Sequence, residues 1–358
     1  MNPSFELGSN PRTPDPDRTM TRCYPTARIP ASAFLVAVLP CACRAEPAPA
    51  QAPAAERVAA EGASQEAELR FDHAAEPTLA VRRARTGHLL VNPLVNGRDV
   101  GAFIFDTGAG ICVVSTPHVA SLGLSEAGAV EALGIGGSTA SQTFVADSLE
   151  LGPMTLSRHT LLATDLGFLE QHLGEPIVGV IGFGVLSRCV AELDFVTPRI
   201  ALFDPARYEL AEGASWLPLD LEGRTPAIRA RFEDREGLFQ IDTGANTAVA
   251  FHEPAVRRWQ LLEGRELGDA RLGGVGGSIA AKSGKLAWFE FAGLRQDAVD
   301  ALFPLERKGS RANATRDGAI GAPLMRPFVM VTDYSHGRVA FRLRVTGAGD
   351  AAKTAAGR

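Results

Sequence analysis

The sequence predicts an all-β protein built from two similar lobes. Three observations support this prediction: 37 Gly and 23 Pro with only 7% aromatic residues, short apolar runs bounded by turn residues, and one internal repeat. The 46% hydrophobic content is enough for a sizeable core. The net charge of -5 gives no electrostatic basis for binding nucleic acid or an anionic membrane surface.

The repeat begins with residues 103–109, Phe-Ile-Phe-Asp-Thr-Gly-Ala, which return as residues 239–245, Phe-Gln-Ile-Asp-Thr-Gly-Ala. Three further landmarks recur in the same order at offsets of 139 or 140 residues: the Gly-rich segments 133–138 and 272–278, the segments 179–182 and 318–321, and Asp194/Arg199 with Asp333/Arg338. Two copies are too few for a solenoid, so we expect two lobes.

Each copy is predicted to form strands in the same order. Residues 89–95 and 100–105 flank Asn96-Gly97, a dipeptide typical of a tight hairpin turn. Residues 227–232 and 237–241 form the corresponding hairpin of the second copy. Further apolar runs predict strands at 144–151, 190–195, 200–203, 286–291, 329–334 and 339–343.

The N-terminal region has the layout of a secretory signal peptide that starts at Met20. A basic stretch precedes an apolar run at 31–39, which is too short to span a membrane as a helix. We expect cleavage after Ala45. Lipid attachment at Cys41 or Cys43 and a disordered cytosolic N-terminus are alternatives. The chain is therefore expected to be exported: periplasmic, secreted or lipid-anchored at the cell envelope.

The remaining composition changes define the expected domains. They are a leader at 1–45, a disordered Ala/Pro/Glu-rich linker at 46–77, a first lobe at 78–206, a connection at 207–215, a second lobe at 216–345 and a disordered tail at 346–358.

The repeated order of Asp-Thr-Gly-Ala, a Gly-rich segment and an aliphatic residue before Gly resembles the retropepsin-like aspartic proteases. The resemblance covers about 79–204 and 216–343, and it is to an exported, bacterial-type member with both lobes on one chain, arranged as in pepsin. It implies two closed β-barrel lobes with pseudo-twofold symmetry, a cleft between them, and a monomer. The sequence departs from the family at Gly110 and Asn246, and neither Gly-rich segment has the Tyr of pepsin-like flaps.

Asp106 and Asp242 are the expected catalytic pair. Two carboxyls in contact cannot both ionise readily, so one can act as the base that activates water while the other donates a proton to the carbonyl oxygen. In the family, the residues after each Asp support the catalytic loops, which here are Thr107, Gly108, Thr243 and Gly244. The flaps and loops that bind substrate would include Ala109, Gly136, Gly137, Ala245, Gly276 and Gly277.

No cofactor or metal is expected. The Gly-rich segments lack the spacing of phosphate-binding loops, and there is no C-x-x-C or H-E-x-x-H motif. Cys112 and Cys189 are expected to be buried thiols, with a disulfide as the alternative. The Asp/Arg pairs at the two later turns are expected to be exposed ion pairs of little energetic value.

The sequence thus predicts an endopeptidase that cleaves extended peptide or protein segments, which would bind as an added strand between the flaps and the floor of the cleft. A non-catalytic peptide-binding or sensor module on the same fold is the alternative. A further alternative keeps the chemistry but pairs each lobe with its twin in another chain.

Overall fold

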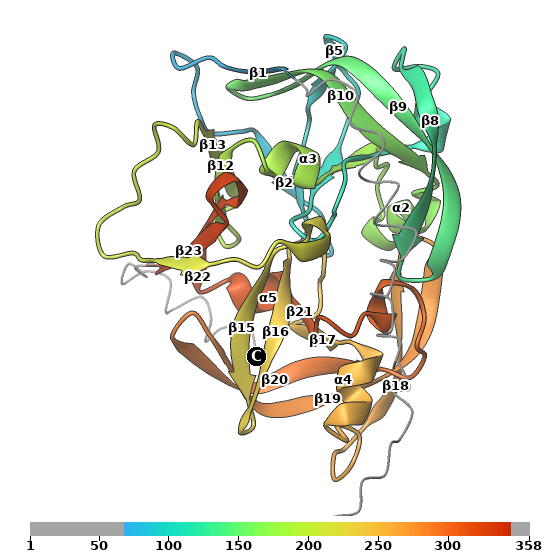
Figure 1. The fold of residues 1–358 in the computed structure, drawn as a ribbon, viewed down its shortest axis with the longest axis vertical. Coiled ribbons are helices and arrows are strands. Elements are labelled where there is room, and N and C mark those ends of the chain that lie inside the picture. The colour runs from blue at the N-terminus through green and yellow to red at the C-terminus, as the bar shows by residue number, and fades with distance from the viewer. Residues whose placement is uncertain (1–67, 345–358) are drawn as a thin grey trace, which may run out of the picture. The chain divides into compact units, whose positions relative to one another are not determined.

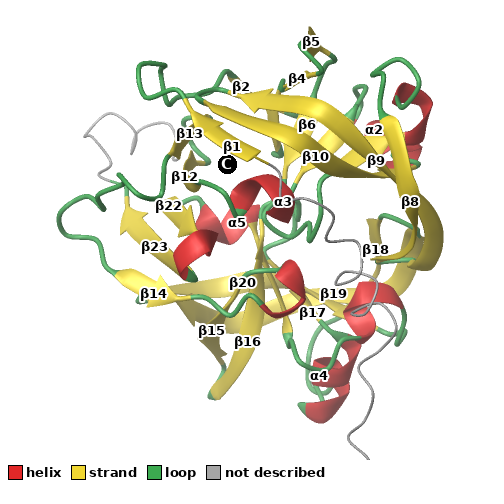
Figure 2. Ribbon diagram, turned by 45° about the horizontal axis from the view of Figure 1, so that its top comes forward, coloured by secondary structure: helices red, strands yellow, loops and turns green. Residues whose placement is uncertain are grey.

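The computed structural model describes residues 68–344 and is almost entirely β (Figures 1 and 2). The expected signal peptide, the candidate lipid-attachment cysteines, the linker up to residue 67 and the tail after residue 344 lie outside the described residues. No helix in the described part of the chain is long and apolar enough to cross a bilayer.

The first lobe is an 11-stranded curled sheet in the order β2-β3-β6-β11-β7-β10-β9-β4-β5, with β1 on β10 and β8 on β9. Its elements are β1 (Glu68–Phe71), β2 (Val81–Arg83), β3 (Leu89–Val91), β4 (Leu94–Val95), β5 (Arg98–Asp99), β6 (Phe103–Phe105), β7 (Val113–Ser115), η1 (Thr116–His118), β8 (Ser125–Gly134), β9 (Gly137–Leu151), β10 (Met154–Thr164), α2 (Gly167–Leu173), β11 (Gly179–Ile181) and α3 (Phe183–Leu186).

The second lobe repeats this plan as a seven-stranded sheet, β15-β16-β21-β17-β20-β19-β18, in which β15 also pairs with β19 and closes a six-stranded barrel. Its elements are η2 (Glu222–Arg224), β15 (Ala227–Phe232), β16 (Arg235–Asp242), β17 (Val249–Phe251), α4 (Glu253–Arg258), β18 (Gly268–Gly274), β19 (Gly277–Phe291), β20 (Leu294–Pro304), η3 (Gly309–Ala312), β21 (Gly318–Gly321) and α5 (Ala322–Met325).

The two sheets differ in how they close. The second lobe has one continuous strand, β15, which pairs with both β16 and β19. The first lobe divides the corresponding strand into β3, which pairs with β6, and β4, which pairs with β9. Asn92 and Pro93 lie between them, and proline has no N–H to donate to a sheet ladder. The first sheet is therefore a curled half-barrel, whereas the second is a closed barrel.

A third sheet combines strands from both halves of the repeat. It has five strands in the order β13-β12-β22-β23-β14, and β12 pairs antiparallel with β22. Its elements are β12 (Val190–Asp194), β13 (Arg199–Phe203), β14 (Trp216–Pro218), β22 (Phe328–Asp333), η4 (Tyr334–His336) and β23 (Arg338–Leu343). The expected hairpins are present, and their pairing across the repeat joins the two lobes at this sheet.

The linker expected over 46–77 is too long, because its last part is ordered. Strand β1 pairs antiparallel with β10, so that Leu69 lies opposite Leu156. The backbone N–H of Leu79 donates to the carbonyl of Ile200 at 2.8 Å, and Thr78 bridges to Ala201. Partly buried Leu69 and Phe71 pack on the core, which explains why the segment is held.

The expectation of exposed Asp/Arg pairs at the later turns is wrong. Asp333 is fully buried and contacts Ser335, His336 and Arg338, which hold the pKa of its carboxyl below the usual value despite burial. Asp194 pairs with Arg344 at 3.2 Å. Both carboxylates stabilise turns of the shared sheet, because the lobes cover them in a way that spacing alone does not reveal.

Cys112 and Cys189 are free and buried, as expected, and burial raises their thiol pKa values to about 11 and about 12.

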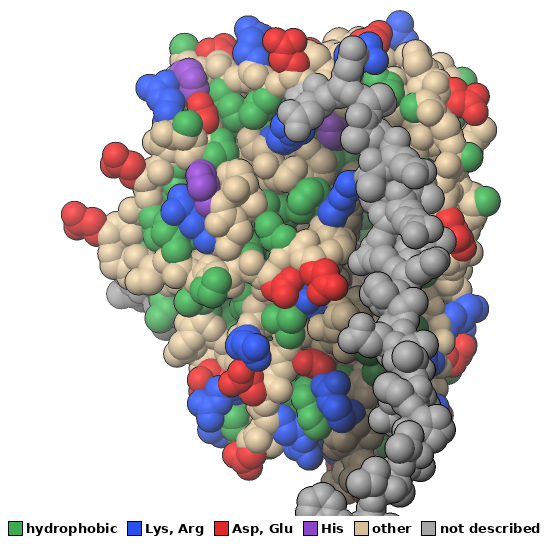
Figure 3. Space-filling model, in the orientation of Figure 1, with side chains coloured by type: hydrophobic (Ala, Val, Ile, Leu, Met, Phe, Trp, Pro, Cys, Tyr) green, Lys and Arg blue, Asp and Glu red, His purple; other side chains and the backbone are tan. Residues whose placement is uncertain are grey.

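Over the face shown in Figure 3, Lys and Arg side chains are interspersed with Asp and Glu, without a large patch of one sign among the described residues.

Candidate active site

Two strands of equivalent position carry the repeated Asp residues to the same place. Strand β6 ends at Phe105 and pairs in parallel with β11, and the N–H of Asp106 donates to the carbonyl of Ile181 at 2.9 Å. In the second lobe, Asp242 ends β16 and lies opposite Gly321 of β21. Each carboxylate therefore follows a strand held on a neighbouring strand, which fixes its position.

The two Asp-Thr-Gly loops bind each other through their threonines. The N–H of Thr107 donates to the hydroxyl of Thr243, and the N–H of Thr243 donates to the hydroxyl of Thr107, both at 3.0 Å. Each hydroxyl also donates at 2.8 Å to the opposite strand, to the carbonyl of Ile241 or Phe105. These four reciprocal bonds are buried and give the site its pseudo-twofold symmetry.

Each glycine of the two loops lies against the carboxyl of the other lobe. A Cβ at Gly108 would meet the carboxyl of Asp242 at 2.7 Å, and one at Gly244 would overlap the carboxyl of Asp106. Glycine is required at both positions because a side chain would occupy the space of the carboxyls. The N–H groups of Gly108 and Gly244 donate to Oδ1 of Asp106 at 2.7 and 3.2 Å.

The carboxyls of Asp106 and Asp242 are in hydrogen-bond contact. Burial, and then the negative charge of Asp242, raise the pKa of Asp106 to about 7, although the two glycine N–H groups act in the opposite direction. Asp106 can therefore hold a proton at a pH at which an exposed Asp would be ionised. One protonated and one ionised carboxyl in contact form an acid–base pair.

A buried arginine that no sequence motif marks lies on one side of this pair. Arg311 of η3 places Nη2 3.5 Å from Oδ2 of Asp242, and its side chain is only 5% exposed. Its Nη1 donates to Nε2 of His252 at 3.1 Å, and Nδ1 of His252 donates to the carbonyl of Asn313 at 3.1 Å. Burial and then the Arg311 charge lower the pKa of His252 to about 3, so this histidine is neutral and can accept from Arg311.

Two more side chains support the loops. Nε2 of buried His88 lies 2.8 Å from the carbonyl of Gly244, and burial lowers the pKa of His88. The hydroxyl of Tyr334 donates to the carbonyl of Thr107 at 3.4 Å, and burial raises its pKa. His88 lies outside the repeated motifs, and Tyr334 follows the landmark Asp333 at a position where the first copy has Phe195, so the repeat identifies neither side chain.

The Gly-rich segments form two long hairpins, β8–β9 and β18–β19, whose tips meet. The N–H of Gly136 donates to the carbonyl of Val275 at 3.2 Å. Ile135 packs on the second-lobe cluster of Ala250, Leu272 and Ile279, whereas Val275 packs on a cluster of the first lobe. Each flap tip is thus anchored on the opposite lobe.

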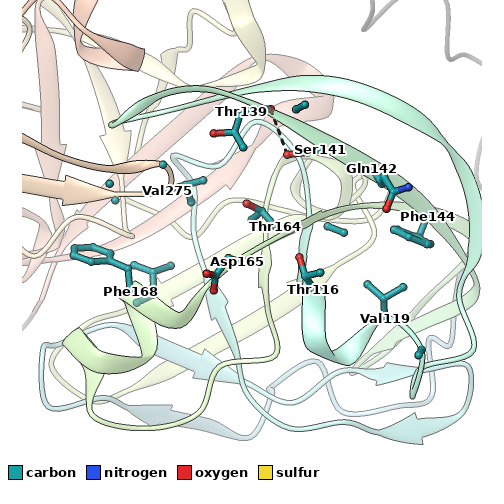
Figure 4. Close-up of a pocket in the computed structure, with 17 residues that line it drawn as sticks. Thr116, Val119, Thr139, Ser141, Gln142, Phe144, Thr164, Asp165, Phe168 and Val275 are labelled. Carbon is teal, nitrogen blue, oxygen red and sulfur yellow. Dashed lines mark hydrogen bonds between the residues drawn. The ribbon is translucent and has the colours of Figure 1, made fainter.

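A cavity of about 740 Å³ lies beneath these flaps on the side of the first lobe (Figure 4). It is lined by η1 and the turn after it, the first half of β9, the end of β10, the start of α2 and the tip of the second flap. Of the expected substrate-binding residues, Gly276 and Gly277 line this cavity. Gly136 and Gly137 belong to the first flap tip and are not in its wall.

Ala109 and Ala245 have backbone roles in the structure. Their carbonyls accept hydrogen bonds from the N–H groups of Phe183 and Ala322 at 2.9 and 3.0 Å, which ties each loop to the segment after β11 or β21. Within residues 68–344, no group of three or more His, Cys, Asp or Glu side chains has an arrangement that could hold a metal ion.

Comparison with known proteins agrees with this geometry in the first lobe. Residues 91–185 match the family model of aspartyl proteases. The matched segment contains Asp106, the first flap and β11. Among solved structures, the chain is similar to basic 7S globulin from soybean, at 12% identity and a TM-score of 0.45 over 77% of this chain and 95% of that one. None of the curated proteins matches this chain.

Proposed function

We propose that this chain is an aspartic endopeptidase that hydrolyses peptide bonds in extended polypeptide segments. The observation that carries the proposal is the contact between Asp106 and Asp242, with the pKa of Asp106 raised to about 7. The match of residues 91–185 to aspartyl proteases supports the same class of chemistry.

In the proposed mechanism, Asp242 is the base and Asp106 is the acid. Arg311 stabilises negative charge on Asp242, and burial favours a proton on Asp106. A water between the carboxyls gives a proton to Asp242 as its oxygen attacks the peptide carbonyl carbon. Asp106 gives its proton to the carbonyl oxygen, and a tetrahedral diol forms. Asp242 then gives its proton to the amide nitrogen as the C–N bond breaks. One hydroxyl of the diol gives its proton to Asp106 as the carboxylic acid forms, so the dyad again has Asp106 protonated and Asp242 ionised.

The flaps suit an extended substrate. Because their tips meet over the site, a peptide strand that enters beneath them would be shielded from bulk water. Main-chain hydrogen bonds to the hairpins would hold the peptide, and cavities such as the one in Figure 4 would receive its side chains.

The test replaces each carboxyl with an amide, Asp106→Asn and Asp242→Asn, and measures cleavage of a mixed peptide library at several pH values. We expect each variant to lose a factor of about 100 to 10,000 or more in cleavage rate. Asp147→Asn, at an exposed position of β9, is the matched control and should retain wild-type cleavage. Wild-type turnover by both dyad variants would rule out the mechanism. Peptide binding by the native protein without any turnover would favour a non-catalytic binding module.

We also propose that the active form is a monomer, because the threonine bonds pair the two lobes within one chain. A mass measurement in solution distinguishes this from pairing between chains.

Export, which rests on residues 20–45, remains a proposal to be tested by cell fractionation and by sequencing the N-terminus of the mature protein.

A further inference from the structure

The cavity beneath the flaps differs in character from the equivalent region of the second lobe. Strands β9 and β19 have equal length and start 140 residues apart, as do β10 and β20, so positions in the two lobes can be paired. Asp165, which follows β10, corresponds to Leu305. Thr139 of the cavity wall, an exposed residue, corresponds to Ile279, which is fully buried in an apolar cluster of the second lobe.

Asp165 is the one charged side chain among the described residues that line the cavity. Its carboxylate is exposed, and Oδ1 accepts from the N–H of Gly167 at 2.8 Å, which fixes the carboxylate at the start of α2. The other oxygen has no hydrogen-bond partner among the residues that the structure describes. In Figure 4 the carboxyl of Asp165 lies between Phe168 and Thr164.

The rest of the wall suits an aliphatic chain. Val119, Phe144, Phe168 and Leu169 contribute apolar surface, and Phe168 is a large hydrophobic residue that is 44% exposed. A substrate side chain that combines a long hydrocarbon stem with a cationic end fits such a wall better than a purely apolar side chain or an acidic side chain does.

A second carboxylate lies next to the wall. Gln142, which lines the cavity, donates to Oε1 of Glu126 on the neighbouring strand β8 at 3.1 Å. This bond orients the Gln142 amide and places negative charge close to the rim. The volume of about 740 Å³ is large enough for a lysine or arginine side chain with water.

We propose that this cavity is a specificity pocket that selects a lysine or arginine side chain of the substrate, with Asp165 as the residue that binds its cationic end. The pocket lies on one side of the pseudo-twofold axis, so the preference applies to one substrate position and not to its counterpart across the scissile bond. This inference rests on the proposed function, because it names the substrate class of the same site.

The test compares peptides that are identical except at one position, which carries Lys, norleucine or Glu. That position is chosen from the cleavage sites of a mixed library, where we expect Lys and Arg to be enriched on one side of the cleaved bond. With the native protein, the Lys peptide should exceed the norleucine peptide in kcat/KM by about 10- to 100-fold, as for a hydrogen bond to a charged group. In Asp165→Asn, which retains an acceptor oxygen for Gly167, this ratio should fall to near one.

Glu170→Gln is the matched control, because Glu170 is on α2 but is not in the cavity wall. It should keep the preference for Lys, whereas Asp165→Lys should reverse it in favour of Glu. The same three peptides are also made with a reduced, uncleavable bond, and their dissociation constants are measured. This arm reports on the pocket even if the chain cleaves nothing, so a failure of the catalytic proposal can be distinguished from a failure of this one. Equal binding and cleavage of the Lys and norleucine peptides by the native protein, or an unchanged ratio in Asp165→Asn, would overturn the inference.

Discussion

Replacing Arg311 with methionine should move the pH–activity profile to higher pH. Nη2 of Arg311 is 3.5 Å from Oδ2 of Asp242, and both side chains are largely buried, at 5% and 16% exposure. At an effective dielectric constant of about 20, two unit charges at this separation attract by about 5 kcal/mol, which is an upper limit because the arginine is itself desolvated. Measured effects of an adjacent opposite charge correspond to about 1 to 3 pH units.

The direction of the shift in the pH–activity profile follows from the charge of the active dyad. The dyad works with one negative charge, and a neighbouring cation stabilises that charge. Without Arg311 the dyad ionises only at higher pH, so the acidic limb of kcat/KM should rise by about 1 to 3 pH units. The basic limb should move in the same direction, because Arg311 also interacts with Asp106. Neither His252 nor His88 is expected to produce the basic limb, because burial lowers the pKa of both rings, that of His252 to about 3.

The assay is kcat/KM of a peptide substrate from roughly pH 2 to 9. Arg311→Lys retains the positive charge and should shift the profile less than Arg311→Met. Arg271→Met removes an exposed arginine of the second flap and is the control for general charge effects. Thermal unfolding checks that each variant is folded. Superimposable profiles for the folded Arg311→Met variant and the wild type would refute the reasoning.

Three further predictions follow from the site. Activity should fall as pH rises through about 7, because Asp106 then loses the proton it must donate; a basic limb centred below about pH 5 would contradict this. Thr107→Val removes two buried bonds of the threonine pair and should destabilise the protein by about 2–4 kcal/mol. Calorimetry should show this as a fall in Tm of roughly 4 to 16 °C. Thr107→Ser keeps the hydroxyl and should have a Tm close to that of the wild type. A methyl group at Gly136 would overlap the carbonyl of Gly276, so Gly136→Ala should reduce kcat/KM with little change in Tm, and unchanged kinetics would argue against flap contact during catalysis.

The fold class and the paired motifs could be read from the sequence because both copies keep the same residues. Asp-Thr-Gly-Ala recurs, and the strands around it retain their apolar runs, so the prediction of an all-β, two-lobed fold is confirmed. The flap hairpins coincide with the Gly-rich segments, because Gly137, Gly276 and Gly277 at the two tips adopt positive φ angles, which glycine allows without strain.

The features that the sequence did not reveal lie where the two copies diverge. Arg311 is on η3, and the corresponding stretch of the first lobe forms α2 instead, so no repeated pattern marks it. Its burial depends on the first flap and on His252, which are distant in sequence. The cavity next to Asp165 is likewise lined by residues that differ from their repeat counterparts, such as Thr139 in place of buried Ile279, and periodicity does not encode that difference.

The shared five-stranded sheet has a consequence for biosynthesis. Strand β12, Val190–Asp194, pairs with β13 soon after it is made, but its other edge waits for β22, Phe328–Asp333. At about 5 to 20 residues per second, the ribosome needs roughly 7 to 28 s to supply that partner. During this interval the nascent first lobe presents an unpaired apolar edge, which is a template for aggregation. Correct folding of the complete chain is therefore expected to require a chaperone that covers this edge until β22 has been synthesised.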